Sequence, residues 1–265
     1  MYVSLPASST SEVPFGPSAG PRYLSASLRS VSRWTRRPCS WRQMYRPGFF
    51  AELDRQLALL EGAPLAFART LRFALLEVLA TARYPHDRSN GRRFMALIRT
   101  FSDWPDADRV SLQQLQVSKR SAGCPTLRAD VDRRLEGWER GARIWRGSEI
   151  DPFAGELATV QEATVEQQKH ATDLIDRGRY VSLLWKLRNF RAHEGRNPTP
   201  GFPFEEPEEP YYSLWGFPEA HYRLVIPDGL VRALALRCAA NLRLWVENED
   251  RDPYDSFPDL RSWID

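Results

Sequence analysis

The chain has 265 residues and a formal net charge of +3, from 37 basic and 34 acidic residues. Hydrophobic residues make up 42% of it, enough for a buried core, and nine tryptophans and nine tyrosines argue against general disorder. No apolar run reaches the roughly 18 residues that a membrane-spanning helix needs, so we expect no membrane span.

Three scattered cysteines, Cys39, Cys124 and Cys238, show neither CxxC nor Cys/His ligand spacing. We therefore expect no disulfide framework and no metal site, and a reducing cytoplasm is the simplest location. Neither GxxxxGK[ST] nor GxGxxG occurs in the chain. Because these glycine loops cradle phosphates, their absence predicts no nucleotide cofactor of the P-loop or Rossmann kind, and we expect no cofactor at all.

Residues 1–43 carry most of the basic excess. They contain six arginines and one acid, a net charge of +5, which leaves the remainder of the chain at −2. This stretch is rich in Ser, Pro and Arg and lacks helical or strand periodicity, so we expect it to be a disordered basic extension. Its role stays open between an RNA-contacting arm, a targeting peptide, and a dispensable extension ahead of a true start at Met44.

Helical periodicity begins after Pro47-Gly48. Apolar residues at three- and four-residue spacing predict one helix through Leu60, a second from Pro64 to about Tyr84, and a third over 90–101. Glu77 lies inside the second helix, where a structural role is more common than an active-site role. Residues 110–117 are ambiguous between a short helix and an extended segment.

The pattern then predicts a long charged helix from Thr126 to Trp145, with Trp145 in its apolar stripe. Asp151-Pro152 has the form of an N-cap followed by proline at the first helical position, so we predict that another helix starts there and runs towards Gly178. His170 lies in its polar middle and is predicted to be a surface residue.

The next predicted helix begins near Tyr180 and ends at Gly195, which lets the chain turn away. Leu183, Leu187 and Phe190 recur at helical spacing and are predicted to face the core. Asn189 and His193 are four residues apart and share another face. The helix end therefore combines a permanent cation, Arg188, with an amide and a titratable imidazole.

This combination suits phosphodiester chemistry. The arginine fork can hold a phosphate and its developing negative charge, and histidine can transfer a proton near neutral pH. In RNA the 2′-hydroxyl is an internal nucleophile, so no metal ion is required. A solvated arginine and a helix-terminal histidine stabilised by the helix dipole would give the same spacing, and arginine supplies 34 of the 37 basic residues.

A proline-rich acidic loop follows, and then two strand-like runs, Tyr211–Trp215 and His221–Ile226, precede a last amphipathic helix over 230–246. We predict a mostly α fold, a bundle of about six or seven helices with a small β-hairpin before the last helix. Residues 44–250 are predicted to form a single domain, with 251–265 as an acidic tail.

The segment Arg188-Asn-Phe-Arg-Ala-His193, with a polar residue directly after the arginine, resembles the R-x4-6-H motif of the HEPN superfamily. The hairpin and final helix after it also resemble that family. The resemblance covers residues 150–247, and more loosely 47–247.

The resemblance implies a small helical bundle, a motif in a cleft between two protomers, and metal-independent endoribonuclease activity, as in toxin–antitoxin and phage-defence systems. Arg188 would stabilise the phosphate charge, His193 would act as general acid or base, and Asn189 would orient it. The implied partners are RNA, a second copy of the chain as a homodimer, and an antitoxin or other protein. Because some HEPN domains lack catalysis, a non-catalytic module that binds a nucleotide or a partner is the alternative.

Overall fold

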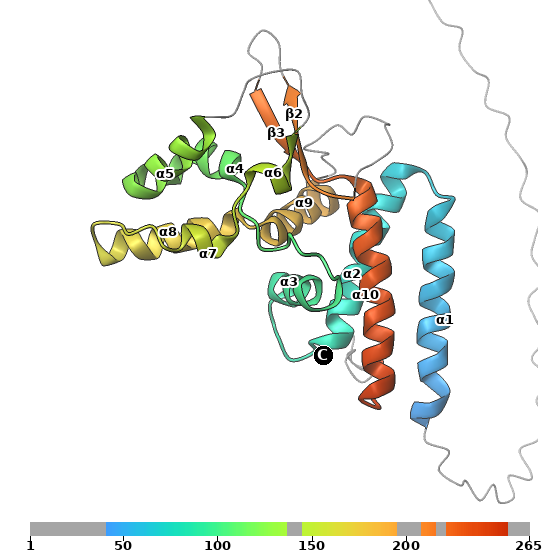
Figure 1. Cartoon of the computed structure of the whole chain (residues 1–265). Helices are drawn as coiled ribbons and strands as arrows, with labels where there is room; N and C mark the ends of the chain where they lie inside the picture. The colour runs from blue at the N-terminus through green and yellow to red at the C-terminus, as the bar shows by residue number, and fades with distance from the viewer. Residues whose placement is uncertain (1–40, 137–144, 195–207, 216–220, 254–265) are drawn as a thin grey trace, which may run out of the picture. The chain divides into compact units, whose positions relative to one another are not determined.

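The computed structural model describes residues 41–136, 145–194, 208–215 and 221–253, all within one compact unit (Figure 1). These ranges contain ten α-helices, one 3₁₀ helix (η1) and three strands. In chain order they are α1 (Trp41–Glu61), α2 (Leu65–Arg83), α3 (Asn90–Phe101), α4 (Leu112–Val117), η1 (Lys119–Gly123), α5 (Pro125–Glu136), β1 (Trp145–Arg146), α6 (Gly147–Ile150), α7 (Ala154–Leu157), α8 (Val165–Gly178), α9 (Tyr180–Glu194), β2 (Tyr211–Trp215), β3 (His221–Val225) and α10 (Asp228–Asn248).

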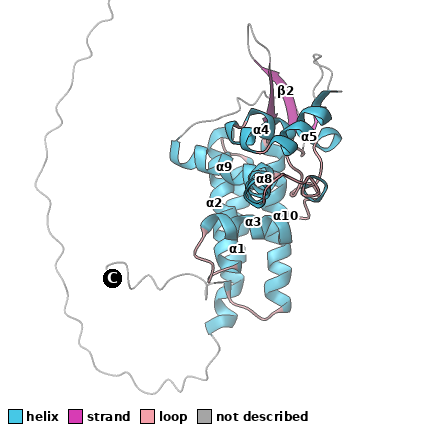
Figure 2. Cartoon of the chain, turned by 90° about the vertical axis from the view of Figure 1, so that its left-hand side faces the viewer, coloured by secondary structure: helices cyan, strands magenta, loops and turns pink. Residues whose placement is uncertain are grey.

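The predicted fold class is confirmed. Seven of the described helices have twelve or more residues, and β2 and β3 form an antiparallel hairpin directly before α10. Helices make up most of the described chain in both views (Figure 1 and Figure 2). Among the described residues no helix is both long and apolar enough to cross a membrane. The predicted extension over 1–43 and the predicted tail lie largely outside the described residues.

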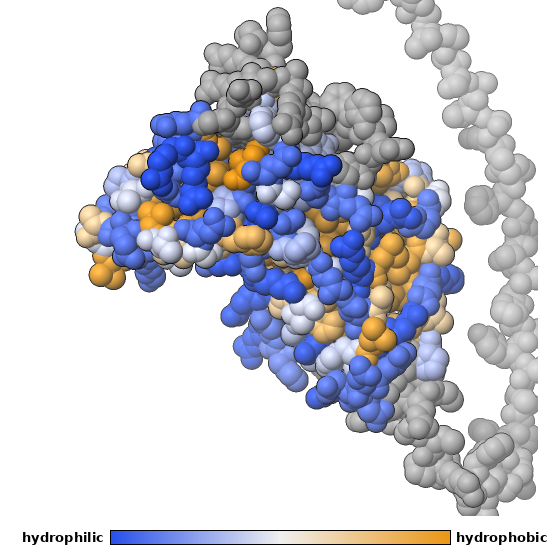
Figure 3. All heavy atoms as spheres, viewed as in Figure 1, coloured by the Kyte–Doolittle hydropathy of each residue, from blue (hydrophilic) through white to orange (hydrophobic). Residues whose placement is uncertain are grey.

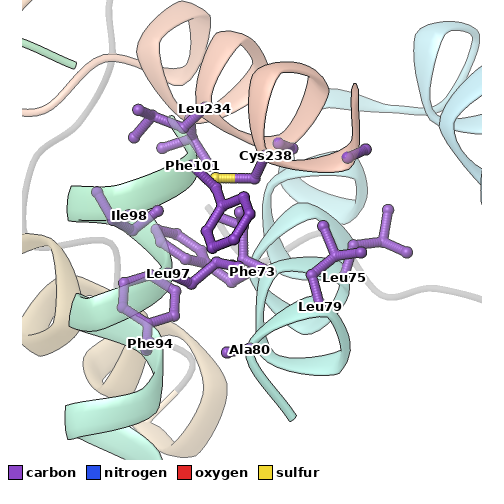
Figure 4. Packing of buried hydrophobic residues seen from close by; sticks show 14 of the residues in the cluster. Phe73, Leu75, Leu79, Ala80, Phe94, Leu97, Ile98, Phe101, Leu234 and Cys238 are labelled. Carbon is purple, nitrogen blue, oxygen red and sulfur yellow. The ribbon is translucent and has the colours of Figure 1, made fainter. Parts of the chain in front are cut away.

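The larger buried cluster is built by α1, α2, α3, α9 and α10. Phe94, Leu97 and Ile98 are fully buried on one face of α3, as their three- and four-residue spacing predicts. Phe73 and Leu79 of α2 and Leu234 and Cys238 of α10 point towards the same region (Figure 4). Apolar side chains also reach the surface along the line between α10 and α1 (Figure 3).

A second, smaller cluster lies among α4, α5, α7 and α8. Its fully buried members include Val110, Leu112, Leu127 and Leu157. The helix α8 begins at a capping box, in which Thr164 Oγ1 accepts a hydrogen bond from the Gln167 backbone N–H at 3.1 Å and Gln167 Oε1 accepts one from the Thr164 N–H at 3.2 Å. The single helix predicted between Asp151 and Gly178 is therefore wrong, since α7 ends at Leu157 and α8 starts at Val165.

Two further boundaries differ from the prediction. The first helix begins at Trp41 and includes Pro47, so the Pro-Gly pair does not mark its start. The helix predicted to reach Trp145 ends at Glu136 among the described residues. Trp145 instead pairs with Tyr212 in an antiparallel ladder, which extends the hairpin to a three-stranded sheet of order β1–β2–β3. An apolar stripe alone does not show whether a tryptophan near the end of the stripe belongs to the helix or to a following strand.

Asp151, predicted to be an N-cap, is instead a buried hydrogen-bond acceptor 1% exposed to solvent. Its Oδ2 accepts hydrogen bonds from the hydroxyls of Tyr180 at 2.5 Å and Tyr212 at 2.6 Å, and its Oδ1 accepts one from the Leu112 N–H at 2.9 Å. Ser111 Oγ lies 2.8 Å from the Tyr212 hydroxyl. One carboxylate thus links the start of α4, the start of α9 and strand β2.

Gly147 makes this arrangement sterically possible. A Cβ atom there would overlap the Tyr180 hydroxyl and lie 3.1 Å from the Pro210 carbonyl oxygen. The Gly147 N–H donates to that same carbonyl at 2.8 Å, so the backbone is held close to the tyrosine. Any side chain at position 147 would therefore displace the Tyr180 hydroxyl from Asp151.

Burial of Asp151 raises the pKa of its carboxyl to about 6, despite the opposing hydrogen bonds from Tyr180 and Tyr212. Because the folded state holds this proton more tightly than the unfolded state does, the stabilising contribution of Asp151 is complete below its unfolded pKa and is lost as the pH rises through about 6. Between pH 4.5 and 7.5 the Asp151→Asn variant should gain about 2 kcal/mol of unfolding free energy relative to the wild type. Urea unfolding at both pH values measures this difference.

Asp108→Asn is the matched control. Burial raises the pKa of Asp108, but its bonds to Arg179 and Arg99 outweigh that effect and leave the pKa lowered. The Asp108 carboxyl therefore stays ionised across this window in both states, and the stability difference of its variant should not change with pH. A constant difference for Asp151→Asn as well would contradict the protonation of Asp151 in the folded protein.

Candidate functional site

The helix that carries the motif, α9, starts at Tyr180 as predicted and extends to Glu194, where this range of described residues ends. Leu183, Leu184 and Leu187 are at most 9% exposed and pack into the larger cluster. The prediction for Phe190 is wrong, because its side chain is 42% exposed. Phe190 lies on the side of α9 that faces α4 and β3, where it lines a groove.

Arg188 is held by a carboxylate from α2. Its Nη2 donates to Glu77 Oε2 at 2.6 Å and its Nε donates to Glu77 Oε1, so the pair is bidentate. The two side chains are 15% and 23% exposed. Glu77 and Arg188 are 111 residues apart in the chain, and the packing of α2 against α9 brings them together.

Asn189 completes this arrangement. Its Oδ1 accepts a hydrogen bond from Arg188 Nη1 at 3.0 Å. The structure thus brings together two of the three predicted site residues, and the amide contacts the guanidinium. The proposed contact between Asn189 and the histidine stays a prediction, because the side chain of His193 is outside the described residues.

The ring of Trp185 packs against the guanidinium of Arg188. The Arg188 Cζ lies 5.1 Å from the centre of the Trp185 ring, within range of a cation–π contact, and that ring packs against Phe94 at 5.3 Å. A Cβ at Gly91 would come within 2.9 Å of Trp185 Nε1, so the close approach of α3 to α9 requires a glycine there. The orientation of Arg188 therefore depends on α2, α3 and α9 together.

Burial lowers the pKa of Arg188, because partial desolvation disfavours the charged form of a cation. A guanidinium nevertheless remains charged at any physiological pH. The desolvation of the pair is offset by its fork-to-fork geometry, and removal of one partner would leave a partly buried charge.

His193 lies in the last turn of α9, but its side chain is not described. At about 100° per residue, position 193 lies roughly 140° around the helix from Arg188 and only about 40° from Asn189. Within one copy of the helix, Arg188 faces α2 while position 193 follows a different face. The spacing of the motif alone does not reveal this, since the direction of Arg188 is set by Glu77.

The other polar candidates have local roles. His170 Nε2 lies 3.1 Å from the Arg120 carbonyl oxygen, and His86 is exposed in a turn. Arg99 of α3 pairs with Asp108 at 3.0 Å. Tyr212 is fully buried, and its hydroxyl donates to Asp151.

Comparison of the chain with protein-family models, with curated protein sequences and with solved structures finds no match in any of the three. Among the described residues, no group of three His, Cys, Asp or Glu side chains is placed to hold a metal ion. The motif and the geometry around α9 are therefore the features that indicate a function.

The Glu77–Arg188 pair should contribute measurable coupling energy. In a double-mutant cycle of Glu77→Ala and Arg188→Ala, we expect a coupling of about 1–3 kcal/mol, because each single change leaves a partly buried charge without its partner. Urea unfolding of the four proteins measures it.

The exposed pair Glu52–Arg55 on α1 is the control, since its side chains are 44% and 69% exposed. Its cycle should give a clearly smaller coupling, because solvent screens an exposed pair. Equal coupling in the two cycles would show that Glu77 does not hold Arg188 in solution.

Proposed function

We propose that the chain is a HEPN-like, metal-independent endoribonuclease that cleaves RNA by attack of the 2′-hydroxyl. The supporting features are the Arg188-Asn-Phe-Arg-Ala-His193 motif, its position in the second half of a helix, and the bundle of helices around that helix. A cytoplasmic toxin or phage-defence effector is the biological role that fits this activity.

The observation that carries the proposal is the orientation of Arg188. A surface arginine samples many rotamers, whereas Glu77, Asn189 and Trp185 hold this guanidinium in one place. A preorganised cation stabilises developing negative charge without reorganising during the reaction. Glu77 would then be a positioning residue, which acts through Arg188.

The chemistry needs only proton transfers and charge stabilisation. The 2′-oxygen of the substrate forms a bond to the adjacent phosphorus while the bond from phosphorus to the 5′-oxygen breaks. One proton leaves the 2′-hydroxyl and one is added to the departing 5′-oxygen, with His193 as the base or the acid. The products are a 2′,3′-cyclic phosphate and a 5′-hydroxyl end.

A homodimer is part of this proposal. Because Arg188 and position 193 lie about 140° apart on α9, one copy of the helix does not direct both towards a single phosphate. Two copies that bring their α9 helices together can offer Arg188 from one protomer and His193 from the other. This arrangement also matches the cleft between protomers that the HEPN resemblance implies.

The second candidate is a non-catalytic HEPN-like module that binds a nucleotide or a protein partner, such as an antitoxin. The bidentate pair between Arg188 and Glu77 favours it, because the carboxylate already neutralises the guanidinium. In that case Arg188 would only stabilise the bundle.

Cleavage of RNA in excess EDTA distinguishes the two candidates. The full chain should release fragments with 2′,3′-cyclic phosphate ends, and Arg188→Ala and His193→Ala should each lower the rate about 10²- to 10⁴-fold. His170→Ala is the matched control and should cleave like the wild type, since its imidazole lies on α8 and is hydrogen-bonded to the Arg120 carbonyl oxygen. Cleavage that is equal in all proteins, or absent from the wild type, would rule out this active site.

Mixing two inactive variants tests the shared cleft. In a re-equilibrated equal mixture of Arg188→Ala and His193→Ala, half of the dimers are mixed, and one of their two sites has both residues intact. The mixture should therefore recover about a quarter of the wild-type rate. Mixing without recovery, under conditions where subunit exchange is demonstrated, would contradict a site built from two protomers.

A further inference from the structure

A groove lies on the side of α9 away from Glu77, between α4, α9 and β3. Its cavity volume is 440 Å³, and an adjoining cavity of 340 Å³ extends it towards η1 and α8. We call the two together the cationic groove. The residues that line it include Val117, Arg120, Arg177, Lys186, Phe190 and Arg223.

The charges along the cationic groove are all positive. Lys186 lines both cavities, Arg223 lines the first, and Arg120 and Arg177 line the second, while no Asp or Glu is among the described residues that line either. Arg177 has an acidic partner, Asp173, at 2.7 Å. No acidic side chain of the described part of the chain forms an ion pair with the other three.

These cations lie close enough to affect one another. Burial lowers the pKa of Lys186 most, and the charges of Arg177 and Arg120 lower it further, while the charge of Asp173 raises it by less. Its Nζ donates to the Arg177 carbonyl oxygen at 3.2 Å, which holds the ammonium at the boundary between the two cavities. Mutual repulsion of this kind would be relieved by a bound polyanion.

The floor of the cationic groove is apolar. Val117 is 60% exposed and Phe190 is 42% exposed. Three further apolar residues, Leu183, Leu187 and Leu224, also line the first cavity. A large exposed aromatic beside several cations offers a ring face for a planar ligand as well as charge for its phosphates. Free phosphate has no planar group to place against that ring.

We infer that the cationic groove binds single-stranded RNA, with phosphates at Lys186 and Arg223 and an unpaired base against Phe190. The inference rests on the proposed function for its choice of RNA, and it adds the strandedness of the substrate and a subsite that the R-x4-6-H motif does not contain. Single strands fit because their bases can be splayed out and stacked on aromatic side chains, whereas bases in a duplex are already stacked.

The position of this groove relates it to the proposed chemistry. Lys186 and Phe190 are four residues apart on α9, and position 193 follows Phe190 by three, so the three positions share one face of the helix. An RNA strand that follows this face passes from the cationic groove to the last turn of α9. Arg188 lies on another face of the same helix. This agrees with the proposal that the Arg188 side chain at this site comes from a second protomer.

Binding is tested with the full chain and a fluorescein-labelled 2′-O-methyl oligouridylate, which lacks the 2′-hydroxyl nucleophile and so cannot be cleaved. Fluorescence anisotropy across a salt series gives the slope of log K against log salt. Each phosphate contact to a single strand contributes about 0.7 to that slope, so Lys186→Gln with Arg223→Gln should lower its magnitude by about 1.4. Phe190→Leu should weaken binding at least about fivefold with little change in slope.

Two matched variants control for general effects of charge and of exposed rings. Lys169→Gln removes a lysine that lines a different cavity, and Phe67→Leu removes a ring that is 60% exposed on α2. Both should bind the probe like the wild type. Melting temperatures of all variants show whether each is folded, and the exposed positions chosen should leave these unchanged.

The inference is overturned if the groove variants and the controls bind equally, or if the wild type does not bind the probe at low salt. It is also overturned if a duplex of the same length binds more tightly, or if polyglutamate binds in the groove as tightly as the oligonucleotide. Wild-type binding that the groove variants weaken, without cleavage of RNA, would support the groove and contradict the proposed nuclease. Cleavage that the groove variants leave unchanged would do the reverse.

Discussion

The Asp151 carboxylate is the contact on which the arrangement of α9 depends. It accepts hydrogen bonds from Tyr180, the first residue of α9, from Tyr212 in β2, and from the backbone N–H of Leu112, the first residue of α4. Because a helix is rigid along its length, the rotation fixed at Tyr180 also sets the direction of every later residue of α9. The direction of Arg188 towards α2 and the exposure of Phe190 both follow from that rotation.

Those two directions give α9 separate roles on its two sides. One side packs into the larger apolar cluster and presents Arg188 to Glu77, while the other borders α4 and β3 with Lys186 and Phe190. Under the proposed function, a phosphate charge stabiliser and a strand-binding surface would lie on opposite sides of one helix, an arrangement that is hard to use in a monomer. The two would be compatible in a symmetric pair, in which Arg188 of one copy is supplied to the strand-binding side of the other copy.

The parts of the fold that were predicted correctly are those with a local signal. The strands at 211 and 221 alternate and are bounded by turn residues, and α3 shows its apolar face at regular spacing, so both were found from the sequence. Asp151-Pro152 has the local form of a helix start, but three hydrogen-bond partners from distant segments decide its role. The partner of Arg188, Glu77, is likewise 111 residues away in the chain. The motif therefore identified the candidate residues but could not predict the direction in which the Arg188 side chain points.

The contact between Gly147 and Tyr180 makes these two positions dependent on each other. The hydroxyl of Tyr180 occupies the space that a side chain at position 147 would need, and in return the bare backbone of Gly147 leaves that hydroxyl room to reach Asp151. A larger residue at one position is therefore compatible only with a smaller one at the other. In a set of diverged sequences this would appear as paired changes, with a side chain at 147 only where the tyrosine at 180 has lost its hydroxyl.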